Sequence, residues 1–386
     1  MTQTCDIAII GGGPVGSALA RALKDSAFSV RLLEARTGAS SDARALALSY
    51  GSRLLLERLG AWDALQHVSA IRTIHVSQKQ GFGRTLLRAS EMNVPELGYV
   101  LPYPSLHKAL QYGHAMQGAN VTGIESDANH ATIRYRQACT EPDDADGEEH
   151  ELSARLAILA DGGKLLADRY PPKMRDYGQS ALISHVTCTD PKPDTAFERF
   201  TPDGPLALLP YMDGYELVWT APHERMEQML AWDDARFLHE LHCHFGDRVG
   251  RFRSAGKRSS FPLGLKKAKD QAPMPRVVLI GNAAQTMHPV AGQGFNMGLR
   301  DAWELAQEIL DARPESLGTE EMLAGYRRSR LADREGGTGF TDSLVRLFSN
   351  DLPIVSQLRS ASLTALDCMP FVKKFVARRM MFGANG

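Results

Sequence analysis

The pattern of hydrophobic and polar positions changes character along the chain. Residues 5–10 (CDIAII) and 28–34 (FSVRLLE) are short and largely apolar, which is typical of strands buried on both faces. The segment between them begins with glycines and then places Leu19 and Leu23 on one helical face. This order predicts a strand–helix–strand unit of about thirty residues.

The middle of the chain differs from both ends. Residues 173–270 contain β-prone runs interrupted by prolines, which predicts an antiparallel sheet. The apolar run 277–281 (VVLIG) then returns to the first pattern and precedes a helix at about 296–312. Further expected elements are a helix at 49–60, strands at 129–136 and 152–160 on either side of a solvated acidic loop at 141–151, and a largely helical tail from Thr341.

This arrangement predicts an α/β protein with two discontinuous domains and a helical extension. The first domain would comprise residues 1–75, 98–172 and 272–345. The inserted domain, with its antiparallel sheet, would comprise residues 76–97 and 173–271. Residues 346–386 would form the C-terminal helical extension.

Composition narrows the functional class. The 386 residues include 44 Lys and Arg and 45 Asp and Glu, so a broad nucleic-acid surface is not expected. Five cysteines without a C-x-x-C pair, and histidines without ligand spacing, predict neither a disulfide framework nor a metal site. The N-terminus lacks a signal peptide, and no apolar run reaches the ~20 residues that span a bilayer. We therefore expect a cytoplasmic protein.

A glycine hexad between the first strand and helix predicts a dinucleotide site. Gly11, Gly13 and Gly16, with Pro14 and Val15 between the last two, fit G-x-G-x-x-G. The free N–H groups and dipole of the following helix suit a pyrophosphate. Glu34 ends the second strand 23 residues after Gly11, where a carboxylate can accept the adenosine ribose hydroxyls. The neighbouring Arg36 leaves a 2′-phosphate open as an alternative.

A second glycine-rich segment follows the strand at 277–281 and favours a flavin over a nicotinamide cofactor. It reads GNAAQTMHPVAGQGFNMGLRD from Gly281 to Asp301. Small residues at its start allow close approach of a ligand. Gly292 and Gly294 leave N–H groups bare at the start of the next helix. Those donors suit the negative charge of a reduced flavin.

These motifs together resemble the group A FAD-dependent aromatic hydroxylases. The hexad with Glu34, the Asp161–Gly162 pair and the 281–301 segment carry the likeness, which extends from about Asp6 to Phe348. The late segment is similar to that of the ubiquinone-biosynthesis branch, the 2-polyprenyl-6-methoxyphenol hydroxylases of UbiH type. The segments 198–210 (ERFTPDGPLALLP), 255–263 and 341–348 resemble the same branch. The resemblance implies a para-hydroxybenzoate-hydroxylase-like fold, with a Rossmann-like FAD-binding domain and an inserted substrate domain.

The resemblance also assigns site residues. Gly11, Gly13, Pro14, Val15 and Gly16 would hold the FAD pyrophosphate. Glu34 and Arg36 would lie at the ribose, and Arg44 and Asp161 would belong to the cofactor site. Gly281 and Asn282 would meet the ribitol and pyrophosphate, and the residues bordering the isoalloxazine would be His288, Pro289, Gly292, Gly294, Phe295 and Asn296. Three positions depart from the wider family: Asn282 replaces Asp, Pro104 stands where an arginine is usual, and Asp161–Gly162 is not followed by the usual Ser and Arg.

The resemblance implies chemistry carried by the flavin, with NAD(P)H as electron donor and no certain catalytic side chain. Reduced flavin and O2 would form a C4a-hydroperoxide that hydroxylates a polyprenylated phenol. Such an intermediate requires a dry, apolar pocket. Candidate lining residues from the inserted sheet are Leu208, Leu209, Tyr211 and Trp219. Because strand positions alternate, only about half of such candidates can face the pocket.

Several alternatives remain open from the sequence. The substrate could be hydroxylated at another ring position, or could be a soluble aromatic acid. The chain could instead be a non-catalytic FAD-bearing subunit of a biosynthetic complex, or a flavin reductase of prenyl double bonds. The tail at 368–383 mixes Phe and Val with Lys and Arg, which indicates either peripheral contact with the inner membrane surface or packing on protein, including a homo-oligomer.

Overall fold

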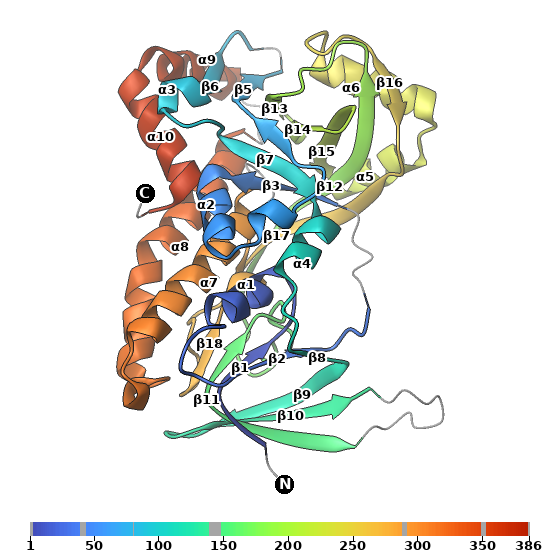
Figure 1. Ribbon diagram of the computed structural model, residues 1–386. Helices are drawn as coiled ribbons and strands as arrows, with labels where there is room; N and C mark the ends of the chain where they lie inside the picture. The colour runs from blue at the N-terminus through green and yellow to red at the C-terminus, as the bar shows by residue number, and fades with distance from the viewer. Residues whose placement is uncertain are drawn as a thin grey trace.

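The computed structural model describes residues 3–38, 44–79, 81–138, 148–287, 292–348 and 353–384. Within them, three sheets and the helices around them form the molecule (Figure 1). The predicted strands and helices are confirmed, with ends shifted by a few residues. The helix expected at 296–312, for example, runs from Gln293 to Asp311.

The first sheet has seven strands in the order β8-β2-β1-β11-β10-β9, and β18 pairs with β11. β1, β2, β8, β11 and β18 are parallel, whereas β9 and β10 join antiparallel. The strands are β1 (Gln3–Ile10), β2 (Val30–Glu34), β8 (Ala115–Gln117), β9 (Ala119–Ser126), β10 (Ala131–Gln137), β11 (Glu149–Leu159) and β18 (Val277–Leu279).

Apolar residues alternate between the two faces of this sheet. Ile7 and Ile9 pack in one buried cluster with Leu19 of α1 and Leu305 of α7. Ala8, on the same strand, faces a second cluster on the opposite side. Burial on both faces explains why the strand is an almost uninterrupted apolar run. The helices on the first face are α1 (Pro14–Ala22), α4 (Tyr103–Leu110), α7 (Gln293–Asp311) and α8 (Glu320–Phe348).

The second sheet has nine strands and is mainly antiparallel, as expected for the inserted region. Its order is β19-β17-β12-β15-β14-β13-β5-β6, with β16 beside β12. Within this sheet, the β5–β13 pair is the only parallel one among the described strands. The strands are β5 (Thr73–Gln78), β6 (Arg84–Arg88), β12 (Lys173–Cys188), β13 (Thr195–Thr201), β14 (Gly204–Tyr211), β15 (Gly214–Pro222), β16 (Phe252–Ala255), β17 (Ser259–Lys267) and β19 (Gln285–Thr286).

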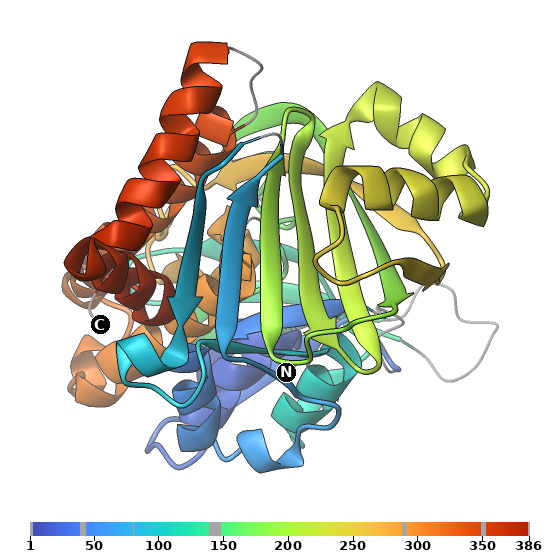
Figure 2. The ribbon, with the colours of Figure 1, turned by 90° about the horizontal axis from the view of Figure 1, so that it is seen from above.

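Helices cover this sheet at two places (Figure 2). α5 (His223–Ala231) and α6 (Asp234–Phe245) pack on one face through a cluster that contains Trp219 and Phe237. α9 (Pro353–Cys368) lies against β5 and β6, and α10 (Pro370–Phe382) contacts α2 (Tyr50–Arg58) and α3 (Ala89–Met92). The predicted C-terminal extension therefore packs on the body of the protein.

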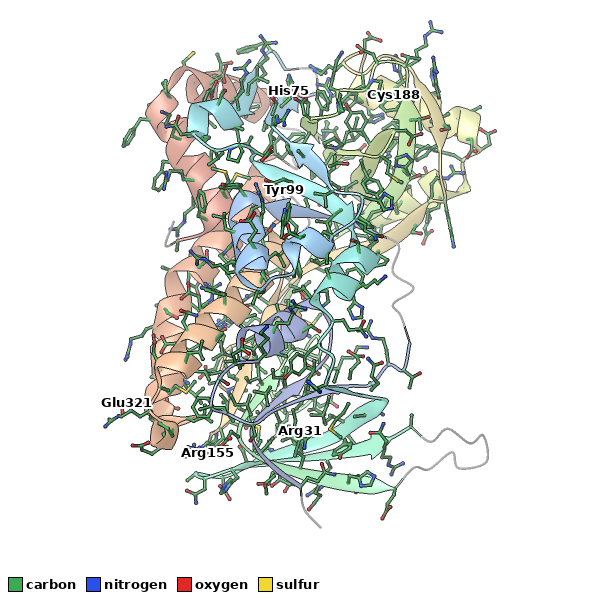
Figure 3. The ribbon with its side chains drawn as sticks, in the orientation of Figure 1. Arg31, His75, Tyr99, Arg155, Cys188 and Glu321 are labelled. Carbon is green, nitrogen blue, oxygen red and sulfur yellow. The ribbon has the colours of Figure 1, made fainter. Side chains whose placement is uncertain are left out.

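A small third sheet joins the two larger ones. It contains β3 (Ala45–Ser49), β7 (Gly98–Pro102) and β4 (Ser69–Ile71) in the order β3-β7-β4. Tyr99 of β7 lies between the first sheet, marked by Arg31 and Arg155, and the second, marked by His75 and Cys188 (Figure 3). None of the helices in the described part of the chain is long and apolar enough to cross a membrane.

Candidate active site

Three chain segments meet at the carboxyl edge of the first sheet. β1, β11 and β18 are neighbouring parallel strands, so the loops that follow them leave from the same edge. A Cβ on Gly11 would lie 2.6 Å from the carbonyl oxygen of Ala160. Gly11 also has a φ of 107°, which favours glycine. The hexad, the turn after β11 and the late glycine segment therefore share one site.

The loop after β1 has the features of a phosphate cradle. A Cβ on Gly16 would lie 2.0 Å from the carbonyl oxygen of Gly11, so this contact admits only glycine. Gly13 differs, because a Cβ there would meet nothing within 4 Å. Gly13 is the N-cap of α1, and no side chain of the described residues caps that end. The first N–H groups of α1 thus face open space where a phosphate can approach.

Glu34 lies beside this loop and is held there by hydrogen bonds. The backbone N–H of Gly12 donates to Oε2 at 2.7 Å, and Nε of Arg36 donates to Oε1 at 2.8 Å. Burial of the carboxyl opposes its ionisation, but the hydrogen bonds and charge of Arg36 outweigh it and lower the pKa of Glu34. Because Arg36 is engaged by Glu34, this ion pair favours ribose hydroxyls over a 2′-phosphate.

Two further predicted residues lie in the neighbourhood with different roles. Arg44 lines the cavity described below, with its guanidinium carbon 5.6 Å from the centre of the Phe261 ring. The carboxylate of Asp161 accepts backbone N–H bonds from Gly163 and Leu165 at 2.8 and 2.9 Å. Asp161 therefore shapes the turn after β11, while the backbone around Gly162 lines the cavity.

The start of the late glycine segment is held by a hydrogen bond to α7. Gly281 has a φ of 58°, and its N–H donates to Asp301 Oδ2 at 3.0 Å. Asn282, next in the chain, is exposed and lines the cavity. A Cβ on Gly281 would come within 3.1 Å of Val15 on α1, so the two predicted cofactor segments touch each other here.

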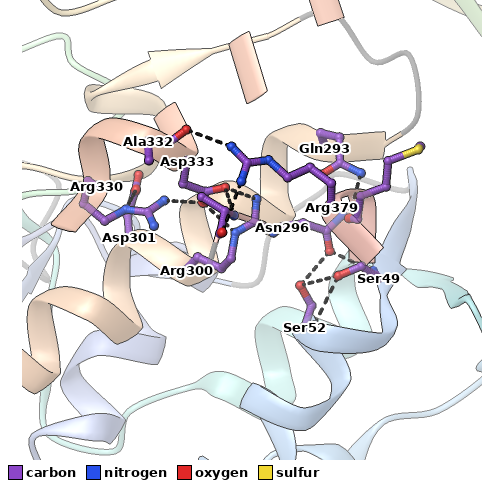
Figure 4. Close-up of polar contacts among 12 residues, drawn as sticks. Ser49, Ser52, Gln293, Asn296, Arg300, Asp301, Arg330, Ala332, Asp333 and Arg379 are labelled. Atoms are coloured by element: carbon purple, nitrogen blue, oxygen red, sulfur yellow. Dashed lines mark hydrogen bonds and ion pairs between the residues drawn. The ribbon is translucent and has the colours of Figure 1, made fainter. Parts of the chain in front are cut away.

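Asn296 connects the start of α7 to β3 and α2 (Figure 4). Its Oδ1 accepts from the backbone N–H of Ser49 at 2.8 Å and from Ser52 Oγ at 2.7 Å. Its Nδ2 donates to the carbonyl oxygen of Gly292 at 2.6 Å. Four of the residues expected to border an isoalloxazine, Gly292, Gly294, Phe295 and Asn296, line the cavity. His288 and Pro289 lie outside the described residues.

One continuous cavity of about 750 Å³ joins these cofactor segments to the second sheet. Its walls include Pro14, Gly281 and Gly294 at the cofactor end, and Leu209 and Val218 of the second sheet. Leu209 therefore lies where it was expected. Tyr211, two residues later, is not among the described residues that line the cavity, and it packs instead against the small cluster of Ile71, Val100 and Ala196.

The predictions that Leu208 and Trp219 line the pocket are wrong. Both side chains lie in the cluster beneath α5 and α6, on the opposite face of the second sheet. Trp219 is paired with Leu206, and Val218 next to it faces the cavity. The alternation of strand positions was anticipated, but the face covered by helices could not be assigned from the strands alone.

Several site residues were missed by sequence reasoning. Tyr103 of α4 lines the cavity near Arg36, and His107 Nε2 lies 3.2 Å from the carbonyl oxygen of Gly12. Tyr103 and His107 lie on either side of Pro104, the position where the wider family usually has an arginine. The inner faces of α9 and α10 also line the cavity, through Leu363, Leu366, Val376 and Met380. The spacing of apolar residues in these two helices predicts that one face of each is buried. Nothing in the local sequence indicates that this face closes the cavity.

The residues present fit FAD. The site offers bare N–H groups at a helix start, an ionised carboxylate for ribose hydroxyls and an open approach at Gly13. It continues into a cavity that residues of both predicted cofactor segments line. No group of His, Cys, Asp and Glu suited to a metal ion occurs among the described residues.

Comparisons with known proteins agree with this geometry. The chain matches the family of FAD-binding domains over residues 4–336. It is 31% identical to the ubiquinone hydroxylase UbiL of Rhodospirillum rubrum, over 98% of this chain and 90% of that protein. It is 30% identical to the 3-demethoxyubiquinol 3-hydroxylase of Escherichia coli K12, over 96% and 97% of the two chains.

A solved structure shows the same fold. The p-nitrophenol 4-monooxygenase PnpA of Pseudomonas putida DLL-E4 superposes with a TM-score of 0.79 at 16% identity, over 99% of this chain and 100% of that one. The predicted fold class, an FAD-binding α/β domain with an inserted antiparallel sheet, is therefore confirmed.

Proposed function

This chain belongs to the FAD-binding family of flavoprotein hydroxylases. From that premise we propose that it hydroxylates a polyprenylated phenol in ubiquinone biosynthesis, using NAD(P)H and O2. One observation carries the proposal: a single cavity runs from the cofactor cradle over an apolar sheet face to the C-terminal helices. Bound FAD, once reduced by NAD(P)H, supplies the oxygen-activating redox chemistry. The names of the relatives from Rhodospirillum rubrum and Escherichia coli support the substrate class.

The chain's own residues bind and orient the reactants. The first N–H groups of α1 and the open backbone at Gly13 hold the pyrophosphate, and Glu34 accepts the ribose hydroxyls. Asn296 fixes the start of α7 against β3, so the bare N–H groups beyond Gly292 keep their direction when the flavin is reduced. Such preorganised donors stabilise developing negative charge.

The cavity walls exclude water from the reacting ring. Between the cofactor segments and α9, the second sheet presents mainly aliphatic side chains, among them Val76, Ala207, Leu209 and Val218. A prenyl tail is also aliphatic, and α9 and α10 close the far end with Leu363 and Met380. The ring therefore lies over the sheet near the flavin, with the tail directed toward the C-terminal helices.

We further propose that α10 rests on an anionic membrane surface. Its inner face lines the cavity through Val376 and Met380, while Phe371 and Phe375 on the outer face are 86% and 65% exposed. Lys374 and Arg378, on the same side, are also exposed. Lys373 is different: it is buried in ion pairs with Glu91 and Asp367, which fasten the helix to the body. Exposed aromatic residues among basic ones suit the interface of an anionic bilayer.

The proposed reaction is tested by oxygen uptake with FAD-loaded protein, NADH or NADPH, and 2-prenyl-6-methoxyphenols of increasing tail length. We expect substrate-stimulated uptake and a product heavier by one oxygen atom by mass spectrometry. Leu363→Trp, which fills the far end of the cavity, should lower the rate on long tails and spare a phenol without one. No uptake with either nucleotide and any of these phenols would overturn the proposed function.

The membrane contact is tested by co-sedimentation with phosphatidylglycerol–phosphatidylcholine vesicles. We expect wild-type protein to sediment, and less so at high salt because screening weakens the basic contacts. The double variant Phe371→Ser/Phe375→Ser should lose at least tenfold in binding. Met174→Ser, which removes an equally exposed apolar side chain from β12, is the matched control and should bind normally. Equal binding by the double variant would exclude α10 as the contact.

A further inference from the structure

One carboxyl group lies on the apolar face of the cavity. Glu198 of β13 is paired with Val76 of β5 on one side and Ala207 of β14 on the other. Paired residues of neighbouring strands present their side chains on the same face of a sheet. Glu198 and both partners line the cavity, and the row continues to Val218 and Ile183 on the next two strands. The four neighbours Val76, Ala207, Val218 and Ile183 are aliphatic, and beyond them the row ends in the hydroxyl side chains of Thr85 on β6 and Ser259 on β17.

Glu198 has no polar partner among the described residues. No hydrogen bond or ion pair of its carboxyl group with them is present, although protein encloses it apart from the cavity. The neighbouring Arg199 cannot serve, because it lies on the opposite face and donates to the carbonyl oxygen of His244 and to Ser77. Its carboxyl group opens only to a largely apolar cavity, where a carboxyl without a partner is costly, so its presence indicates a ligand that supplies one.

No charged or titratable group that the structure describes around β13 pairs with Glu198. His75 of β5 is paired with Phe197 and so faces away from the cavity, as does Arg199. Within the described lining, the other titratable side chains are Arg44 and Tyr103, both at the cofactor end. Burial raises the pKa of Glu198 to about 7, which leaves it able to accept or return a proton near neutral pH.

We propose that Glu198 binds the phenolic hydroxyl of the substrate and acts as the general base that takes its proton. This inference rests on the proposed hydroxylase function. The phenol O–H bond breaks and a carboxyl O–H bond forms, while the electron pair stays on the phenol oxygen. That pair raises the electron density of the ring, which forms the new carbon–oxygen bond with oxygen supplied by O2 and reduced FAD. When the ring carbon releases its hydrogen as a proton to water, Glu198 returns its proton to the phenol oxygen.

The geometry suits this role. Glu198 stands on β13, two strands from the β6 edge of the second sheet, with β17 and β19 leading to the late glycine segment on one side and β5 and β6 leading to α9 on the other. A phenol with its hydroxyl at Glu198 has its ring between the flavin edge and the helical end. The tail then extends toward Leu363, and the hydroxyl meets the carboxyl that the described part of the chain leaves unpaired.

The test compares Glu198→Gln, which keeps the shape and cannot take a proton, with wild type. We expect kcat/KM of the wild type to rise with pH through about 7, because the carboxylate is the active form. Glu198→Gln should lose this limb and fall roughly 10²-fold or more in hydroxylation rate. FAD affinity, followed by flavin fluorescence, should be unchanged. Peroxide released per NAD(P)H should increase as product yield falls.

A second readout separates a base from a structural residue. A fluorinated prenylphenol that is already ionised at the assay pH needs no base, so it should restore most of the rate of Glu198→Gln. The control is Glu216→Gln, which alters another buried carboxyl of the same sheet that has a backbone partner at Ala45. It should keep the pH limb near 7.

The outcomes distinguish the two proposals. If wild-type protein hydroxylates none of the phenols, the proposed function fails. If wild type is active and Glu198→Gln keeps both its rate and the pH limb, the role of Glu198 is excluded while the function stands. If the fluorinated phenol does not rescue a slow Glu198→Gln variant that binds FAD normally, Glu198 is not the base.

Discussion

Nε of Arg330 lies 2.8 Å from Oδ1 of Asp301, and the two side chains are 1% and 0% exposed. The other carboxylate oxygen of Asp301 accepts the N–H of Gly281 at 3.0 Å and Nε2 of Gln285 at 2.8 Å. This ion pair therefore links α8 through α7 to the Gly281 loop of the proposed cofactor site. Asp333 extends the same network toward Arg300 (Figure 4).

Asp301→Asn should cost about 3–5 kcal/mol of unfolding free energy, because it leaves the Arg330 guanidinium buried without its counter-charge. FAD should also bind more weakly, since the Gly281 loop loses an ionised acceptor. Urea denaturation and flavin fluorescence measure the two effects. Asp270→Asn breaks a half-exposed ion pair with Arg327 and should cost no more than about 1 kcal/mol. Equal losses in the two variants would contradict this account.

Two glycines of the same loop should respond differently to alanine. Gly16→Ala places a Cβ 2.0 Å from a backbone oxygen, so we expect a large loss of stability or no folded protein. Gly13→Ala meets no protein atom within 4 Å and should fold normally. Its methyl group would occupy the approach of the pyrophosphate, so FAD affinity should fall at least tenfold. Thermal unfolding of the apoprotein, with FAD titration, distinguishes them. A Gly13→Ala protein with unchanged affinity would argue against the phosphate cradle.

Glu34→Gln should weaken FAD binding about tenfold or more, because hydrogen bonds to an ionised acceptor are the stronger kind. The lowered pKa of Glu34 also sets the sign of a pH effect on apoprotein stability. Its contribution is present above the unfolded value of ~4.3 and is lost as the pH falls through the lower folded value. The stability difference between wild type and Glu34→Gln should therefore shrink below about pH 4. A difference that grows on acidification would contradict this assignment.

Glu198→Gln should stabilise the apoprotein at high pH. The pKa of Glu198 is raised from 4.5 to about 7 in the folded state, so the contribution of this group to stability is greatest below pH 4.5 and falls as the pH rises to 7. At pH 8 the variant should exceed wild type by up to about 3 kcal/mol, and near pH 4 the two should be equal. Denaturant unfolding at both pH values measures this. An equal gain at both would show that the change is in packing rather than in charge.

The glycine loop of the proposed cofactor site was predictable from the sequence because its requirements are local. A strand, a tight glycine turn and a helix must follow one another, and Gly11, Gly16 and Glu34 satisfy sterics and hydrogen bonding within one strand–helix–strand unit. The 281–301 segment could be recognised for the same reason. The elements themselves were also predictable, since burial on both faces or on one face leaves a distinct apolar period.

The substrate end of the cavity was decided by tertiary structure. Which alternate positions of the second sheet face the ligand depends on where α5 and α6 pack, and that choice buries Trp219 and opens Val218. Closure of the cavity depends on α9 reaching β6, where Thr85 donates a hydrogen bond to the carbonyl oxygen of Leu363. Glu198 has its unusual environment only because strands distant in sequence surround it with aliphatic side chains. Periodicity specifies that a face is buried, but contacts between distant segments determine what buries it.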